Sequence, residues 1–196
     1  MASEQLPARL ILGLRALLAL LLGLTGFFMV LLAAFLPRAS VALIVQLFTG
    51  FTLLDGLLCL VAGAQVARRP AAKVFLLLIG LMEVGVAADA FLLIPRVGER
   101  PQVILPVFVV WAVTLGLLEL AWAFAARVQR GRALLVVTAL FSIAFGLLAY
   151  SSPTGDLMTA VWRSAVYFFF LGILRLLITF RVQAPITEPG VAPAVR

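Results

Sequence analysis

Long, uninterrupted apolar runs constrain this chain more than any other feature. One of them, LLALLLGLTGFFMVLLAAFL, contains no charged residue at all. A helix needs roughly 20 apolar residues to cross the bilayer core, because every backbone polar group must be satisfied inside the segment. Six such runs occupy most of the chain, at residues 16–36, 41–65, 74–94, 102–126, 133–150 and 157–180. They predict an all-α integral membrane protein with six transmembrane helices.

The composition of the chain favours the same class. Hydrophobic residues make up 65% of the chain and charged residues only 12%, with a mean hydropathy of +1.23. So little polar surface cannot cover a soluble domain of this length. The runs also lack the alternation of a membrane β-barrel strand, and the first run is longer than a signal peptide and has no clear small-x-small cleavage site.

The basic residues predict how the chain is oriented. Three of them, Arg38, Arg96 and Arg100, fall in one set of connections between the apolar runs. By the positive-inside rule, the side with more basic residues is cytoplasmic, so both termini are predicted to lie in the cytoplasm. The net charge of +7 therefore reads as a topology signal and not as a nucleic-acid site. The basic residues of the other side are Arg9, Arg15, Arg68, Arg69, Lys73, Arg127, Arg130, Arg132, Arg181 and Arg196.

The apolar runs fall into three similar units. In each unit a basic residue opens the first run and a proline follows it 21 or 22 residues later, as in Arg15 with Pro37, Lys73 with Pro95, and Arg132 with Pro153. Three tandem helical hairpins of one orientation explain this spacing, and such parallel repeats are usually related by an axis along the membrane normal. The sequence thus predicts a pseudo-threefold arrangement of hairpins at residues 15–69, 73–130 and 132–181.

The two ends of the chain lie outside these hairpins. Residues 1–14 begin polar and become amphipathic, and they are predicted to lie along the cytoplasmic interface before the membrane domain of residues 15–181. Residues 182–196, VQAPITEPGVAPAVR, contain three prolines and few large apolar side chains. They are predicted to be disordered.

A glycine recurs in the second run of each unit. The segments are LLDGLLCLVA, VTLGLLELAW and FFLGILRLLI, with Gly56, Gly116 and Gly172 in equivalent places. Glycine lets membrane helices approach closely, so these three are predicted helix contacts. Three residues after each glycine, the chain carries Cys59, Glu119 and Arg175 in turn.

The hairpin pattern resembles the HdeD family of bacterial acid-resistance membrane proteins. The segments that carry the resemblance are RALLALLLGLTGFFMVLLAAFLP and FTGFTLLDGLLCLVAGAQVARR, followed by two weaker copies, and they cover nearly the whole chain from Arg9 to Arg181. The outer turns PRAS, PRVGERP and PTGD replace the proline-glycine turn usual in that family. The resemblance implies a multi-pass protein of the bacterial inner (plasma) membrane that takes part in a stress response, the survival of acid.

Several ionisable residues fall inside the predicted spans. A charge at the centre of a membrane helix costs on the order of 2.5 to 3.5 kcal/mol on insertion scales. Such side chains are expected to face the interior of the bundle and to find partners there. The candidates, for a structural or a relay role, are Asp55, Glu83, Asp89, Glu119, Arg163 and Arg175.

Mutual neutralisation is one interpretation of these charges. Glu119 and Arg175 have equivalent places, so they are predicted to form an ion pair beside Cys59, with Asp55 on the same face one turn away. Asp89 is predicted to pair with Arg163 nearer the outer side. The repeat alignment also places Glu83 with Thr25 and Ser142 in a second polar layer, and Arg15 with Lys73 and Arg132 at the cytoplasmic edge.

Two other function classes stay open. Carboxyl groups at staggered depths, at Asp55, Glu83, Asp89 and Glu119, are what a proton or small-solute path through the membrane would need. The chain would otherwise be an accessory subunit of a larger membrane complex, or a homo-oligomer. With no histidine and one cysteine, we expect no metal site, no cofactor and no catalytic residue, and Cys59 is expected to be a packing residue.

Overall fold

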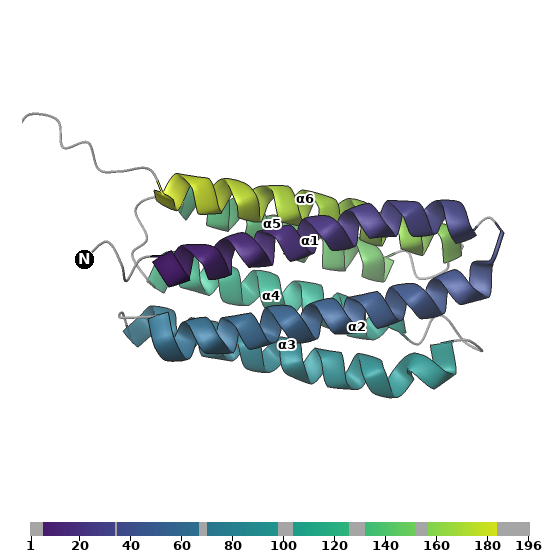
Figure 1. The fold of residues 1–196 in the computed structure, drawn as a ribbon, viewed down its shortest axis with the longest axis horizontal. Helices are drawn as coiled ribbons and strands as arrows, with labels where there is room; N and C mark the ends of the chain where they lie inside the picture. Colours follow the sequence, from purple (N-terminus) through teal and green to yellow (C-terminus); the bar gives the residue numbers. More distant parts are fainter. Residues whose placement is uncertain are drawn as a thin grey trace, which may run out of the picture.

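Six long helices make up the protein in the computed structural model, which describes residues 6–33, 35–66, 70–97, 104–125, 132–151 and 157–183. They run side by side along the long axis of the molecule (Figure 1). A π-helical turn, η1 (Ala62–Val66), continues the second helix. The helices are α1 (Leu6–Ala33), α2 (Pro37–Val61), α3 (Pro70–Val97), α4 (Leu105–Ala125), α5 (Arg132–Ser151) and α6 (Leu157–Gln183).

Each of the six helices is long and apolar enough to cross a membrane. No strand occurs in the described parts of the chain. The prediction of an all-α protein with six helices able to cross a membrane is therefore confirmed for the described residues, and the large outward-facing leucine and phenylalanine side chains suit contact with a lipid bilayer.

The helix ends differ from the predicted ones in three places. Residues 6–14 are the first turns of α1 and not a separate segment, because the apolar helix continues without a break. Pro37 begins α2, since proline fits the first turn of a helix, where its missing N–H would have no partner. Pro95 lies inside α3, which ends only at Val97. The predicted disordered tail, apart from residues 182–183 at the end of α6, lies outside the described residues.

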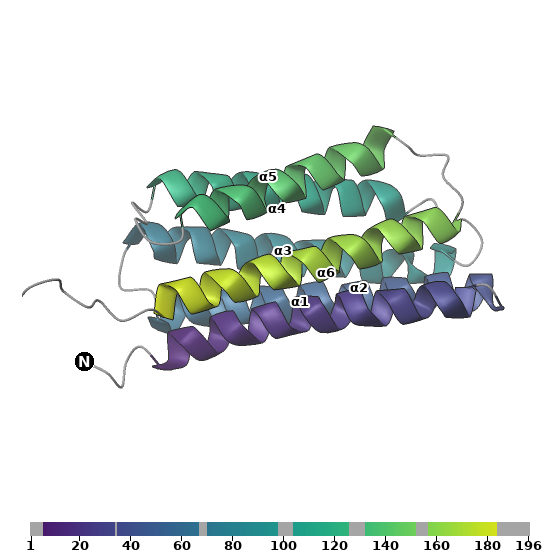
Figure 2. The ribbon, with the colours of Figure 1, turned by 90° about the horizontal axis from the view of Figure 1, so that it is seen from above.

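The helices form a closed ring. The most extensive contacts join α1 to α6, α2 to α3, and α4 to α5, whereas α1 with α2, α3 with α4, and α5 with α6 share smaller contacts. The first and the last helix lie side by side in both views (Figures 1 and 2). A helix of this bundle therefore packs best on a helix from the neighbouring predicted hairpin.

The three aligned glycines lie at these closest contacts. A Cβ atom added to Gly56 would lie 2.9 Å from the carbonyl oxygen of Gly80 in α3. One added to Gly116 would lie 2.6 Å from the carbonyl oxygen of Ala139 in α5. One added to Gly172 would lie 2.6 Å from the backbone nitrogen of Leu20 in α1. Each glycine thus allows two backbones to approach more closely than any side chain would permit.

The core of the bundle has two different halves. In the half farther from the termini, aromatic rings from α2, α4 and α6 pack against one another, with the ring centroids of Phe48 and Phe108 4.8 Å apart. In the half nearer the termini, the same three helices contribute charged side chains. The buried aromatic residues of this set, hereafter the aromatic layer, are Phe48, Phe51, Phe108, Trp111, Tyr167 and Phe168.

Candidate functional site

A group of buried polar side chains lies in the half of the bundle nearer the termini, and we call it the charge cluster. Five helices supply it: α1, α2, α3, α4 and α6. Its ionisable side chains are almost completely enclosed, from 0% exposed for Asp55 and Glu83 to 7% for Arg175. The members are Arg15, Asp55, Cys59, Glu83, Glu119 and Arg175.

Asp55 is the centre of the charge cluster. Its carboxylate accepts two hydrogen bonds from the Arg15 guanidinium, at 2.5 Å from Nε and 2.9 Å from Nη2. It also accepts one from Nη1 of Arg175 at 2.8 Å. Because Asp55 precedes Gly56, it lies where α2 comes closest to its neighbour. Paired, charge-assisted hydrogen bonds of this kind are the strongest that side chains form, so Asp55 joins α1, α2 and α6 firmly.

Arg175 extends the charge cluster to a fourth helix. Its Nη2 donates to Oε1 of Glu119 in α4 at 3.3 Å. Both residues follow their aligned glycines by three positions, and they lie five or six residues before the ends of the apolar spans at Phe180 and Ala125. At 1.5 Å per residue, the pair is roughly 8 Å inside the bundle end. The structure therefore brings Glu119 and Arg175 together, as their spacing predicts.

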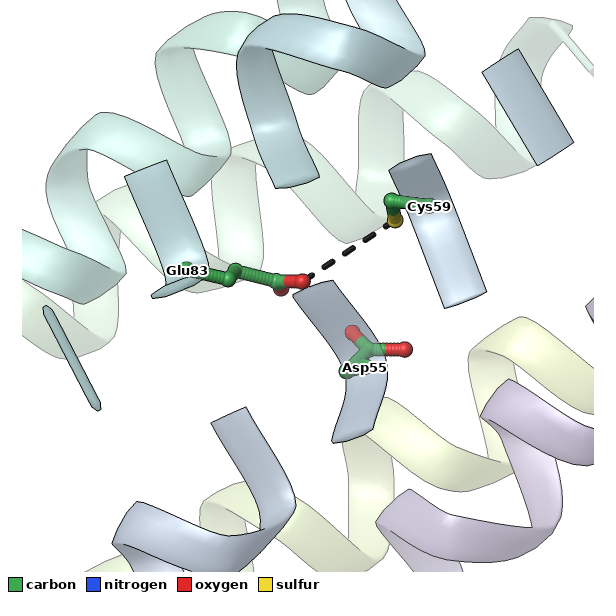
Figure 3. Close-up of side chains that lie close together, drawn as sticks. All are labelled: Asp55, Cys59 and Glu83. Atoms are coloured by element: carbon green, nitrogen blue, oxygen red, sulfur yellow. Dashed lines mark hydrogen bonds between the residues drawn. The ribbon is translucent and has the colours of Figure 1, made fainter. Parts of the chain in front are cut away.

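Glu83 and Cys59 complete the charge cluster. The Glu83 side chain extends from α3 toward α2, where the Cys59 thiol donates to its Oε2 over a sulfur–oxygen distance of 3.9 Å (Figure 3). The other oxygen, Oε1, lies 3.9 Å from Nη2 of Arg15. That distance is too long for a hydrogen bond, so Glu83 meets the guanidinium only through a longer electrostatic contact.

The charges of the cluster do not cancel when every group is ionised. Arg15 and Arg175 carry two positive charges, because guanidinium groups stay protonated in proteins. The carboxylates of Asp55, Glu83 and Glu119 would carry three negative charges. Among the described residues, Oε1 of Glu83 and Oε2 of Glu119 are buried without a hydrogen-bond partner. One carboxyl group is therefore in excess.

Two predicted candidates lie outside the charge cluster. Asp89 is exposed on α3 and Arg163 is half-buried on α6. The expected pairing of Asp89 with Arg163 is wrong: no ion pair joins these two described residues. The reason is the direction in which Asp89 faces, since it is exposed on the outside of α3 and does not point into the core that α3 and α6 share.

Two further expectations about neighbours are wrong. Arg15 was expected at the cytoplasmic edge with Lys73 and Arg132, which are indeed exposed, but Arg15 is buried and bound to Asp55. The reason is that α1 begins at Leu6, nine residues before Arg15, so Arg15 lies inside the span Gly13–Leu32 and not at its end. Glu83 does not form a layer with Thr25 and Ser142. Instead, Thr25 donates to a backbone carbonyl of its own helix, and Ser142 shares a hydrogen bond with Tyr167 at 3.0 Å.

The aromatic layer beside the charge cluster was not predicted. Its most enclosed members are Trp111 and Tyr167, both 0% exposed, with ring centroids 5.8 Å apart in an edge-to-face arrangement. A signal for it exists in the sequence: five residues before the aligned glycines the chain carries Phe51, Trp111 and Tyr167. An aromatic residue at the same place in each repeat indicates a ring layer one to two turns from the charges.

The charge cluster contains donor atoms that a metal ion could use. The ligand atoms of Asp55, Cys59 and Glu83 lie within 4.8 Å of one another (Figure 3). However, both oxygens of Asp55 already accept hydrogen bonds from guanidinium groups. A divalent cation would have to displace these bonds and lie beside two fixed positive charges, so this donor set fits a metal poorly.

What the charge cluster can do follows from its contacts. It links five helices through hydrogen bonds, and it holds the carboxyl groups of Asp55 and Glu83 and the thiol of Cys59 within 4.8 Å of one another. These are the properties of an ionic cross-link or of a proton-binding site. Comparison of the chain with protein-family models, with curated proteins and with solved structures finds no match.

Proposed function

We propose that this chain is a stress-resistance protein of the HdeD type, in which buried ion pairs hold a membrane bundle together when the cell meets acid. The observation that carries the proposal is Asp55, which is bound by guanidinium groups from two other helices. Arg175 passes the link on to Glu119. One connected set of ion pairs thus joins α1, α2, α4 and α6, and a bundle cross-linked in this way keeps its shape in a stressed envelope.

The same proposal covers the repeat, the orientation and the location of the chain. Three tandem hairpins in a pseudo-threefold ring are supported by the contacts of Gly56, Gly116 and Gly172, each of which meets the first helix of the following unit in cyclic order. The basic residues of the sequence support cytoplasmic termini. The resemblance to HdeD supports the bacterial inner membrane as the location.

A double-mutant cycle tests the ionic cross-link. Glu119→Gln and Arg175→Met each remove one side of a buried contact, and both are expected to destabilise the purified protein in detergent or nanodiscs. The double variant should be less destabilised than the sum of the two, with a coupling energy of about 0.5–3 kcal/mol, as is usual for residues in contact. Strict additivity in denaturation would show that the two residues do not interact and would remove this support.

An acid-survival assay tests the physiological role. Bacterial cells would produce the wild type, Asp55→Asn or Asp89→Asn at equal membrane levels, and surviving colonies would be counted after an acid pulse. The wild type and Asp89→Asn are expected to protect, since Asp89 is exposed and outside the charge cluster. Asp55→Asn is expected to protect no better than an empty vector. If the wild type itself gives no protection, the stress role is wrong.

A proton or small-solute path is the second candidate function. The unpartnered oxygens of Glu83 and Glu119 favour it, because a relay needs carboxyl atoms that are not already engaged. The arrangement otherwise argues against a path that crosses the whole membrane. The ligand atoms of Asp55 and Glu83 lie within 4.8 Å of each other, Asp89 is exposed outside the cluster, and the aromatic layer occupies the core farther from the termini. Liposomes that contain the protein and a pH-sensitive dye decide between the proton path and the ionic cross-link. Proton flux above that of empty vesicles would favour the path.

Association with another membrane protein is also compatible with one observation. Asp89 lies exposed on α3 within the span of residues 72–95, where an unshielded carboxylate is costly. A second copy or a partner subunit that covers this face would shield it. Mass measurement in mild detergent tests the idea, and a lone chain for both the wild type and Asp89→Leu would argue against it.

A further inference from the structure

The excess carboxyl group of the charge cluster leads to an inference about its bound ligand. Two guanidinium groups balance two of the three carboxylates, and one negative charge would remain among residues that are at most 7% exposed. An uncompensated buried charge is very costly, whereas a bound proton cancels it without any change of shape. We propose that the charge cluster binds one exchangeable proton and that Glu83 holds it.

The hydrogen bonds single out Glu83 among the three acids. Asp55 accepts three charge-assisted bonds and Glu119 accepts one, all from guanidinium groups. Such bonds favour the ionised form of a carboxyl group. Glu83 accepts none from a cation, because its nearest guanidinium nitrogen is 3.9 Å away. Protonation therefore costs the least free energy at Glu83, because a proton there breaks no hydrogen bond to a guanidinium group.

The groups around Glu83 are consistent with this placement. The helices that pack on α3 present two acids and a thiol, namely Asp55 and Cys59 from α2 and Glu119 from α4. Across the cluster, α1 and α6 present the guanidinium groups of Arg15 and Arg175. Asp55, Cys59 and Glu83 have their ligand atoms within 4.8 Å of one another. A proton on Glu83 neutralises its carboxyl group and so removes the electrostatic repulsion between Glu83 and Asp55.

Binding is a simple addition with no other reagent. A proton from cytoplasmic water joins the Glu83 carboxylate and makes a neutral carboxylic acid, and release returns the same proton and leaves one net negative charge. The charge cluster lies in the half of the bundle nearer the termini, so exchange takes place from that side. This inference rests on the proposed ion-pair function, since it needs Arg15 and Arg175 to be engaged with the other acids.

Infrared spectroscopy of the full chain in lipid nanodiscs tests the proton directly. A protonated carboxyl group has a C=O stretching band that a carboxylate lacks. Asp89, which is exposed, would be replaced by Asn in every sample so that it adds no signal of its own. At neutral pH the Asp89→Asn protein should show one such band, and the further change Glu83→Gln should remove it. The further change Glu119→Gln should leave the band in place.

Three outcomes would overturn the inference. These are no band in the Asp89→Asn protein, a band that survives Glu83→Gln, or a band that disappears only with Glu119→Gln. Each sample would first be checked for folding by circular dichroism and gel filtration. The infrared readout is separate from the double-mutant cycle of Glu119 and Arg175. An additive cycle with an intact Glu83 band would refute the cross-link and keep the proposed proton. A coupled cycle without a Glu83 band would keep the cross-link and refute the proton.

The thiol gives a second reporter that does not need a change at Glu83. Cys59 is the single cysteine of the chain, so its S–H stretching band is unambiguous. Because this thiol donates to Oε2 of Glu83, its band should move to lower frequency when alkaline titration turns the acid into a carboxylate. The C=O band should disappear over the same pH range. If neither band responds to pH while the protein stays folded, the proton is not exchangeable and the proposal is wrong.

Discussion

The two halves of the bundle core use the same three helices and opposite kinds of contact. Toward the termini, α2, α4 and α6 contribute Asp55, Glu119 and Arg175, which are held by directional bonds. In the other half, the same helices contribute the aromatic layer, where rings meet at centroid distances of about 5 to 6 Å. Lipid tails are as apolar as these rings, so the aromatic layer holds through close packing and not through exclusion of water.

This difference teaches which half fixes the arrangement of the helices. Rings can repack with modest loss when one apolar shape replaces another. A buried guanidinium has no such freedom, because every arrangement that separates it from its carboxylate leaves a charge in an apolar core. The charge cluster therefore determines which face of each contributing helix turns toward the common core, and the aromatic layer adds packing to the arrangement that results.

The largest effect is expected from removing the centre of the charge cluster. Asp55→Asn takes away the charge that balances Arg15 and Arg175, and breaking a buried pair in this way costs about 3–5 kcal/mol. The free energy of unfolding, measured by titration with a denaturing detergent, should fall by that amount. Asp89→Asn, which changes an exposed acid on α3, is the matched control and should not lower the free energy of unfolding. Equal losses for the two variants would contradict the division into two halves.

A smaller effect is expected in the aromatic layer. Trp111→Ala leaves a cavity among rings and should cost about 3 kcal/mol of unfolding free energy. Trp111→Phe should cost less than about 1.5 kcal/mol, because a ring remains and the lost indole N–H has no hydrogen-bond partner among the described residues. The same denaturation series measures both. If Trp111→Phe lowers the unfolding free energy as much as Trp111→Ala, the aromatic layer depends on a polar contact. The contrast between a polar and an apolar half of the core would then be wrong.

The smallest of these effects is expected at the close helix contact beside the charge cluster. Gly172→Ala puts a methyl group against the backbone of Leu20, so α1 and α6 must move apart, at a cost of about 1–3 kcal/mol for overpacking. Gly85→Ala is the control, because no atom lies within 4 Å of a Cβ at Gly85. Thermal unfolding of both variants provides the measurement. A stable Gly172→Ala would indicate that the contact is looser than it looks.

Local sequence features were sufficient to predict the six apolar helices and one contact in the charge cluster, the one between Glu119 and Arg175. Apolar runs identify membrane helices because the bilayer imposes a length and forbids unpaired backbone groups. Glu119 and Arg175 were predicted to meet because each follows an aligned glycine by three residues, which gives both the same depth and the same helix face. Repetition in the sequence thus carried information about distance in space.

The errors arose where a position depends on which side of a helix faces the core or on where a helix begins. Asp89 and Arg163 have suitable depths for a pair, yet Asp89 is exposed on the outside of α3, and no local pattern states which side of an apolar helix faces the core. Arg15 aligns with the exposed Lys73 and Arg132, but α1 begins nine residues before Arg15, so Arg15 lies inside the bundle, where it binds Asp55. Glu83 was assigned to another layer because the repeat alignment ignores the closeness of α2 and α3 at Gly56.

The contact between the first and the last helix has a consequence for synthesis of the protein in the cell. Arg15 and Asp55 are 40 residues apart, so they can meet early, while the rest of the chain is still on the ribosome. Arg175 lies 120 residues beyond Asp55 and belongs to the last helix to enter the membrane. Until then, Glu119 lacks the guanidinium that donates a hydrogen bond to it, and the ring is open at α1. Nascent chains stalled before α6 should therefore be sensitive to membrane proteases, and release of the finished helix should end that sensitivity.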